Sequence, residues 1–532
     1  MVSYNLLWAP WISAVDKGGK VIKTGIMGLM KDARQLKEVS DPSPPVQFGI
    51  YRLLIAFTLD ALAPKNVNEL GKLLSKKDGF DMSLLNAYAS KWESRFDLFD
   101  PAHPFYQAAA DPALDKTIEP VSRLMQHLPA GSNTTLFHHG SWDNNAYSFE
   151  QCARGLVTIP PFMTMGGAGK SPSINGAPPM YALVKGDNLF ETILLNVCTS
   201  SKIVQLTGDD PPAWRSDRAV TKEKVSRFSL LQGLTWQPRR VRLIPSEGGI
   251  CTYTGERKEA LVREIYFDPG FQASGEWADS QVAYRIDDKG RTPIRPYEDR
   301  EVWRDIGPIA LLQRDDYVSE KGKVHFERPA VVQQYIELSE KRLFKGNSEI
   351  PIEVYCLRTD LKAKLFEWSL ETLQVPPEIS TMNGAGFQVQ NAIDSAEIVG
   401  RNIRWAIKKA YPREGNGNKA ALDTIVRSTL YSYWNELRRD FYDMFMTGLV
   451  SQATGKDTDI EAPQMLLNQW KEIVKTNGYE CVRTAVDSLD TDAEALRRQI
   501  AAIESYSNIV QAQLYPETRK ANKARRSNKV KA

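Results

Sequence analysis

A glycine-rich segment followed by a lysine is the strongest candidate for chemistry in this chain of 532 residues. The segment runs from Thr164 through Met-Gly-Gly-Ala-Gly-Lys to Ser171 and nearly fits the P-loop pattern GxxxxGK[ST]. A P-loop needs glycine at the first position and a helix after the serine, so that the helix N-terminus faces phosphate. Thr164 takes the first position, and Pro172 follows the serine at once. Nucleotide hydrolysis at Gly166–Ser171 is therefore kept only as an alternative function.

The same segment suits contact with nucleic acid through bare backbone. Gly166, Gly167 and Gly169 have no side chains, so another backbone or a nucleic-acid groove can approach them closely. Lys170 adds a positive charge beside them. A flexible surface loop has the same composition, and the sequence alone leaves both interpretations open.

A second candidate segment begins at Asn133 and contains Phe137, His138 and His139. Adjacent histidines lack the i, i+4 spacing of helical metal ligands, and Asp143 is the closest acid, so we expect no metal here. A phenylalanine beside two imidazoles suits stacking on bases or sugars. Packing of the loop on the core through Phe137 is the structural alternative.

Signatures of catalysis are otherwise missing from the sequence. It contains no GxSxG, no HExxH and no paired-carboxylate cluster. The five cysteines form no CxxC pair, and their odd number in a long chain argues against a secreted disulfide framework. We therefore predict a protein that is not an enzyme, with no catalytic residues, no cofactor and no bound metal.

Composition and charge indicate a globular protein of more than one domain. The chain is 42% hydrophobic and 25% charged, and it is too long for a single core. A net charge of +3 fits a protein that touches nucleic acid at one edge only. The tail from Arg519 to Lys531 is basic without any acid, which fits either a solvated terminus or an arm near a phosphate backbone.

No segment predicts association with a membrane. The N-terminus lacks a basic region followed by a long apolar run, so we expect no signal peptide. The best apolar stretch, Tyr51–Ala63, contains Arg52 and Asp60 and is too short to span a bilayer. We expect a soluble, cytoplasmic protein.

The first part of the chain mixes short strands with helices. Apolar runs at Tyr181–Val184, Val241–Ile244 and Ile352–Cys356 predict strands, and Phe48–Leu62 and Phe190–Cys198 predict helices. Regular βαβ alternation is missing. The pattern therefore predicts fold class α+β, with a large irregular mixed N-terminal domain over residues 1–378.

The remaining residues, 379–532, read as a four-helix bundle with a basic tail. A glycine- and asparagine-containing stretch, Thr381–Gln390, is expected to be a hinge or loop. Amphipathic helices are then predicted over Ala392–Ala410, Ala420–Gln452 and Pro463–Val486, and a fourth helix is expected to be capped at Asp490–Asp492. Short breaks between long amphipathic helices imply antiparallel neighbours, which is the arrangement of a bundle.

Several segments, taken in order, resemble the CasA family, the large subunit of the type I-E CRISPR Cascade complex. The segments are Asn5–Ile12, Asp41–Leu54, His103–Gln107, Lys185–Thr192, Gly233–Arg240 and Val302–Asp305. Each motif alone is weak, whereas their shared order over most of residues 1–375 is specific.

The resemblance implies a non-catalytic subunit that recognises the protospacer-adjacent motif in double-stranded target DNA. Such a subunit promotes R-loop formation and recruits a helicase-nuclease, while base pairing to the crRNA guide reads the remaining sequence. Its other partners are the backbone and small subunits of Cascade. By position in the family, Phe137–His139 would meet the guide and the DNA near the motif. Gly166, Gly167 and Gly169 would lie against the minor groove, whose code is degenerate.

The sequence departs from the family pattern at two places. A glutamine wedge is expected where this chain has Lys362 and Ala363, so a lysine takes the place of the glutamine. At Cys251 some members carry a CxxC pair that suggests zinc, whereas this chain retains one cysteine and predicts none. A pure scaffold that holds the complex without reading DNA is a further alternative.

Overall fold

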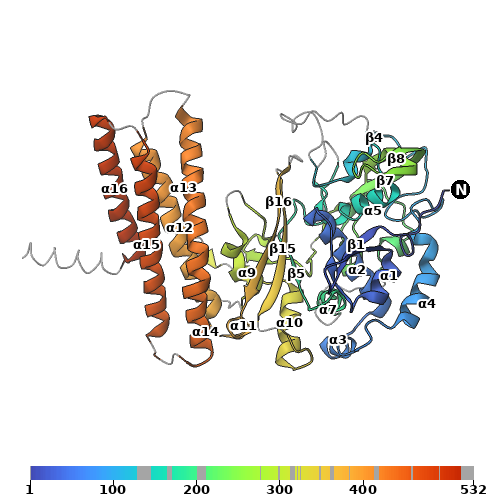
Figure 1. Ribbon diagram of the computed structural model, residues 1–532, viewed down its shortest axis with the longest axis horizontal. Coiled ribbons are helices and arrows are strands. Elements are labelled where there is room, and N and C mark those ends of the chain that lie inside the picture. Colours follow the sequence, from blue (N-terminus) through green and yellow to red (C-terminus); the bar gives the residue numbers. More distant parts are fainter. Residues whose placement is uncertain are drawn as a thin grey trace, which may run out of the picture. The chain divides into compact units, whose positions relative to one another are not determined.

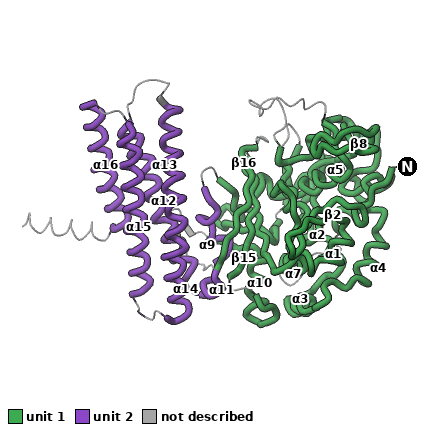
Figure 2. The backbone as a smooth tube through the Cα atoms, viewed as in Figure 1, with its two compact units in different colours: residues 1–297, 324–375 green, residues 298–323, 376–532 purple. Residues whose placement is uncertain are grey.

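The structure is a computed structural model that divides the chain into two compact units (Figure 2). Unit 1 comprises residues 1–297 and 324–375, and unit 2 comprises residues 298–323 and 376–532. The residues described are 2–128, 145–164, 170–199, 211–275, 277–297, 300–311, 318–319, 322–323, 325–346, 349–359, 365–382, 384–411, 418–456, 459, 461–489 and 492–516.

Unit 1 mixes short strands with helices (Figure 1), as the sequence predicted. Its strands are β1 (Ile12–Asp16), β2 (Val21–Thr24), β3 (Leu36–Val39), β4 (Ile118–Pro120), β5 (Tyr181–Val184), β6 (Lys224–Val225), β7 (Arg239–Ile250), β8 (Arg257–Pro269), β9 (Gln272–Ala273), β10 (Tyr284–Asp287), β11 (Gly290–Pro293), β14 (His325–Glu327), β15 (Ile350–Thr359) and β16 (Leu365–Val375). Its helices are α1 (Ile26–Asp32), α2 (Pro44–Leu62), α3 (Val67–Leu74), α4 (Met82–Trp92), α5 (Phe149–Leu156), α6 (Ile159–Phe162), α7 (Leu189–Leu195), α8 (Leu230–Leu234) and α10 (Ala330–Glu340).

The strands of unit 1 form small antiparallel sheets. Their orders are β2-β1-β3, β4-β8-β7, β16-β15-β5 and β11-β10-β14, and β6 and β9 form a parallel pair. No long parallel sheet appears in the part of the chain that the structure describes, which confirms class α+β. The two long hairpins, β7–β8 and β15–β16, carry the segments that matter for function below.

Helix α2 lies at the centre of unit 1 and contacts helices α4–α8 and strands β3 and β15. Pro44 and Pro45 in its first turn fix the backbone where helical N–H groups have no partner anyway. The helix is apolar on nearly every side, as is typical of a helix surrounded by protein. Its length and composition would also suit a membrane span, but most of it is buried inside the unit, as in a core helix.

One buried ion pair joins α2 to the loop before β10. The Arg52 guanidinium contacts the Asp279 carboxylate at 2.6 Å, and both side chains are almost fully buried. Arg52 also donates to the Leu234 carbonyl at 3.2 Å. Asp279 accepts a second hydrogen bond, at 3.0 Å, from the side chain of Asn175. This pair therefore ties α2, α8 and the residues after the glycine segment to one point.

Unit 2 is a helical bundle. It consists of α9 (Ile306–Ala310), α11 (Pro377–Thr381), α12 (Ala385–Ala410), α13 (Asn418–Asp440), a π-helical turn (Phe441–Met446), α14 (Thr447–Ala453), α15 (Ala462–Asp487) and α16 (Ala493–Leu514), together with the strands β12 (Val318–Ser319) and β13 (Gly322–Lys323). The four long helical stretches contact one another, which confirms the predicted four-helix bundle. The Asp492 side chain caps α16 by accepting from the amides of Glu494 and Ala495.

The expected hinge over Thr381–Gln390 is wrong. Residues 385–390 already belong to α12, which begins after Gly384 in a left-handed conformation with φ of 83°. Only glycine adopts that conformation without strain, so Gly384 starts the helix rather than a loop. Composition suggested a loop because Gly and Asn gather here, yet Gly386 lies within α12 and Gly384 stands at its N-cap.

The segment 300–311 packs on the bundle, which the sequence did not indicate. Trp303 is fully buried and lies 4.9 Å from the ring of Phe441. Arg300 and Arg304 both bind the carboxylate of Glu397 on α12. An aromatic anchor and two arginines on one carboxylate therefore hold this segment to unit 2.

We predict that Arg52→Met lowers the free energy of unfolding by about 3–5 kcal/mol, because the Asp279 carboxylate would stay buried without its cation. Chemical denaturation followed by near-UV circular dichroism measures the change. The control is Lys341→Met, which removes an ion pair with Glu337 whose lysine side chain is 49% exposed. The control should cost less than about 1 kcal/mol. Equal stabilities of the two variants would contradict a central role for Arg52.

Candidate nucleic-acid interface

Of the predicted site residues, the structure describes Lys170 alone. Nine others lie outside the described residues: Asn133, Phe137, His138, His139, Gly166, Gly167, Gly169, Lys362 and Ala363. The basic tail lies outside them as well. The geometry therefore concerns the described residues that flank the three predicted segments.

These flanking residues meet around one cavity of about 70 Å³ in unit 1. They are Leu128 before the Phe-His-His segment, Met163, Thr164 and Lys170 around the glycines, and Thr359 and Leu365 on either side of the segment that contains Lys362. The three segments are far apart in the sequence, yet their flanks line the same hollow. Because their flanks line one cavity, we treat the three segments as one site.

Arg239, at the start of β7, binds both ends of the glycine segment. Its guanidinium donates to the Thr164 carbonyl at 2.8 Å and to the Ser171 carbonyl. The side chain is buried, and burial lowers its pKa to about 10. Among the described residues no carboxylate pairs with it. A buried cation thus fixes the two ends of the segment and leaves its own charge uncompensated.

The other charged residues of the cavity form a small network centred on Glu119 of β4. One carboxylate oxygen of Glu119 lies 3.7 Å from Lys170 Nζ, and the other lies 3.2 Å from Arg123 Nε. Lys170 Nζ also lies 5.7 Å from the ring centroid of Phe267. With Arg239, the lining holds three cations and one carboxylate, so the cavity favours anions.

A buried histidine stands just before the Phe-His-His segment. His127 Nε2 lies 3.2 Å from the hydroxyl of Tyr253, and burial lowers the pKa of His127 to about 4. Tyr253 belongs to the turn that begins at Cys251. This turn ties the segment's first flank to the β7–β8 hairpin.

The turn at Cys251 is the position where some family members carry a CxxC pair that suggests zinc. Burial raises the pKa of Cys251, but hydrogen bonds from Thr254, Ser148 and Tyr253 outweigh burial and hold the pKa below its ordinary value. Thr254 stands where a second cysteine would be, and its side chain hydrogen-bonds to the sulfur. No group of three His, Cys, Asp or Glu side chains suited to a metal occurs in the described part of the chain. The residues of this turn do not fit zinc.

The residues after the glycine segment lack the helix that a P-loop needs. Residues 171–180 contain no helix; Ser173 and Gly176 form an isolated bridge across a turn instead. No helix N-terminus therefore follows Ser171 to face a phosphate.

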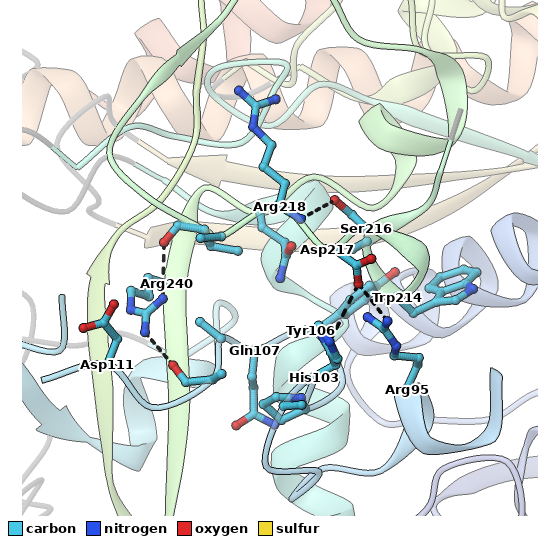
Figure 3. Close-up of a pocket in the computed structure, with 18 of the residues that line it drawn as sticks. Arg95, His103, Tyr106, Gln107, Asp111, Trp214, Ser216, Asp217, Arg218 and Arg240 are labelled. Carbon is cyan, nitrogen blue, oxygen red and sulfur yellow. Dashed lines mark hydrogen bonds and ion pairs between the residues drawn. The ribbon is translucent and has the colours of Figure 1, made fainter. Parts of the chain in front are cut away.

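A second, larger hollow of about 230 Å³ lies between the segments 102–111 and 213–220 (Figure 3). Its basic groups are already engaged with acids. Arg95 and His103 point to Asp217, at 2.7 Å and 3.7 Å (Figure 3). Arg240 pairs with Asp115 at 3.0 Å. Because these charges neutralise each other, the hollow is a weaker candidate for an anionic ligand.

Comparison with known proteins identifies the family. The family model described as CRISPR-associated protein Cse1 matches residues 5–480. The chain belongs to the Cse1 family. It is 28% identical over 519 residues to the CRISPR-associated protein CasA/Cse1 of Thermus thermophilus, covering 93% of this chain and 94% of that protein. The resemblance to CasA-type large subunits drawn from ordered motifs is thereby confirmed.

Solved Cse1 structures share the fold. The crystal structure of Thermus thermophilus CasA matches with a TM-score of 0.71 at 23% identity, over 95% of this chain and 99% of that one. Thermobifida fusca Cse1 matches with a TM-score of 0.72 at 19% identity, over 96% and 98% of the two chains. A chain of a structure described as a CRISPR RNA-guided surveillance complex matches with a TM-score of 0.70 at 18% identity, over 96% and 100%.

The sequence did not predict a role for three charged residues that line the cavity: Arg239, Glu119 and Arg123. Arg239 stood inside a family motif without a role, and Glu119 and Arg123 carried no signal at all. Three arginines within the first four residues of β7, two of them buried, would have been a hint, because a buried arginine needs partners. Nothing in the sequence links Glu119 to Lys170, which is 51 positions later.

We predict that Arg239→Lys speeds hydrogen exchange of the amides in residues 160–175 by about tenfold or more. Lysine lacks the planar fork that reaches two carbonyls at once, so one end of the glycine segment is released. Exchange followed by mass spectrometry measures the change. Arg242→Lys, on the same strand but facing Asp115, is the control. Unchanged exchange at 160–175 in Arg239→Lys would show that the ends hold without it.

We predict that His127 makes stability depend on pH between about 6.5 and 4. The folded state holds His127 neutral down to a pKa of about 4, whereas the unfolded chain binds the proton near 6.5. The unfolded state therefore binds more protons in this window, and stability falls as pH falls, by about 2–3 kcal/mol. Urea unfolding at both pH values measures the change. His127→Gln should flatten the profile, and an equally steep profile in this variant would exclude His127 as the cause.

Proposed function

We propose that this chain is the non-catalytic large subunit of a type I-E Cascade complex and recognises the protospacer-adjacent motif in double-stranded target DNA. In this role it promotes R-loop formation and recruits the helicase-nuclease. Its partners are the crRNA guide, the target duplex, and the backbone and small subunits. It acts in the cytoplasm and needs no cofactor.

One observation carries the proposal: the flanks of the three predicted DNA-contacting segments line one cavity with an excess of positive charge. Loops that reach the same few base pairs can together read a short motif through contacts to base edges. Cations near such loops bind the phosphates that position the protein on the duplex. Family membership and the likeness to a chain of a CRISPR RNA-guided surveillance complex support the same role.

The glycines and Lys170 contribute in different ways under this proposal. Bare backbone at Gly166 and Gly167 would approach the minor groove, whereas Lys170 would bind phosphate regardless of sequence. Segment 360–364, with Lys362 and Ala363, would contact the duplex just past the motif. Lysine there can contact phosphate or base acceptors in the place where family members have a glutamine.

We predict that Gly166→Val together with Gly167→Val weakens binding to motif-bearing duplexes by about tenfold or more and removes the preference among motifs, because side chains would block the groove. Lys170→Ala should weaken binding to all duplexes about equally. It should also reduce by about 1 the salt slope, which is the magnitude of the slope of log K for binding against log salt concentration. Binding of the assembled complex to a library of motif-flanked duplexes, at stated salt, measures both.

Two outcomes would overturn the proposal. Unchanged binding and preference in the valine variant would favour a pure scaffold. ATP turnover that disappears in Lys170→Ala would favour the nucleotide hydrolase. The matched control is Lys258→Ala, a lysine of unit 1 whose partners are Glu150 and Glu256 and which does not line the cavity.

A further inference from the structure

Glu119 is the one acidic residue in the described lining of the cavity, which also holds three cations. A carboxylate is unexpected in a site for DNA, because it repels phosphate. Its position is fixed by the sheet, since Glu119 pairs with Ile265 where β4 meets β8. The side chain is 21% exposed, so solvent and ligands reach it. The question is what a fixed negative charge does there.

The two oxygens of Glu119 bind two different cations. Oε1 faces Lys170 at 3.7 Å, and Oε2 accepts from Arg123 at 3.2 Å. A phosphate of the DNA backbone presents oxygens of the same charge and similar spacing to lysine and arginine. Glu119 therefore occupies the position between Lys170 and Arg123 that a phosphate would take.

The contacts of Glu119 are weak enough to be exchanged. Lys170 Nζ lies 3.7 Å from the carboxylate, too far for a hydrogen bond. The Arg123 side chain is 39% exposed, so its ion pair contributes little to stability. In contrast, Arg239 is buried and engaged with carbonyl groups, so it adds positive potential but stays in place. An anion that enters the cavity would meet cations that only one exchangeable carboxylate neutralises.

We propose that Glu119 is an internal competitor of DNA phosphate that holds Lys170 and Arg123 until a duplex displaces it. This inference rests on the proposed function, because it concerns the same cavity and adds how binding is limited. Competition weakens binding to every duplex. A duplex with a good motif overcomes it through its additional contacts, whereas one with a poor motif does not. Because this cost is similar for every duplex, the ratio of affinities for good and poor motifs stays the same. Glu119 lowers instead the occupancy of duplexes that bind through charge alone.

The test is Glu119→Gln in the assembled complex with its guide RNA. Glutamine keeps the shape and removes the charge, so folding is preserved. Binding is measured against the best and worst motif-flanked duplexes of the wild-type library, at salt from about 50 to about 200 mM. We expect tighter binding to the best and the worst duplexes alike, by about threefold to tenfold, and a salt slope steeper by about 1, because one opposing negative charge is gone.

Two further variants separate competition from a general change of charge. Glu223→Gln removes a carboxylate from an ion pair with Arg218 in unit 1, at 2.9 Å, and should leave the slope unchanged. The double variant Glu119→Gln/Lys170→Ala should lose at least half of the gain, because the freed lysine is gone. Non-additivity of this kind is expected only for residues that act on each other.

A salt slope in Glu119→Gln equal to that of wild type overturns the inference, and so does a gain that Glu223→Gln reproduces. Failure of the proposed function has a different signature. A wild-type complex that binds the best and worst flanks equally would contradict motif recognition, whatever the slope of the variant. The salt slope of Glu119→Gln therefore tests the competition. The ratio of wild-type affinities for the best and worst flanks tests the proposed function.

Discussion

The buried contact between Arg52 and Asp279 is the interaction on which the order of unit 1 depends. A charged side chain in the middle of an apolar helix is tolerated because a carboxylate, the Leu234 carbonyl and the Gln281 side-chain oxygen accept from it. Asp279 in turn holds Asn175, five positions after Lys170. The core of the unit and the residues that follow the glycine segment are thus fixed by the same carboxylate.

At the cavity, Arg239 and Lys170 have different roles. Arg239 gives up its solvent contact to bind carbonyl groups and acts on the backbone, while Lys170 stays partly exposed and free to change partners. Rigid support beneath an exchangeable charge is what recognition of a polyanion requires, because the protein must keep its shape while ions and water leave. Glu119 competes with phosphate for Lys170, which limits binding of DNA through charge attraction alone.

Local patterns in the sequence were sufficient for the helices and for several strands. Strand β5 has the bounds that the apolar run predicted, and the cap at Asp492 begins α16 as expected. Three things were beyond reach because they depend on contacts between distant residues: the meeting of the loop flanks, the pairing of Glu119 with Lys170, and the packing of residues 300–311 on the bundle. The misjudged Thr381–Gln390 shows the opposite limit, where composition suggested a loop and one glycine cap sufficed.

The excursion of residues 298–323 into unit 2 makes the chain cross between the units three times, after residues 297, 323 and 375. A protein shortened to residues 1–375 would lose the bundle but keep Trp303, whose partners Trp434 and Phe441 would be gone. The two units are therefore not modules in the evolutionary sense. Recombination between relatives at a single crossover near residue 375 would pair a foreign bundle with the native segment 298–323 that contains Trp303. This segment and the bundle are therefore expected to be inherited, and to vary, together.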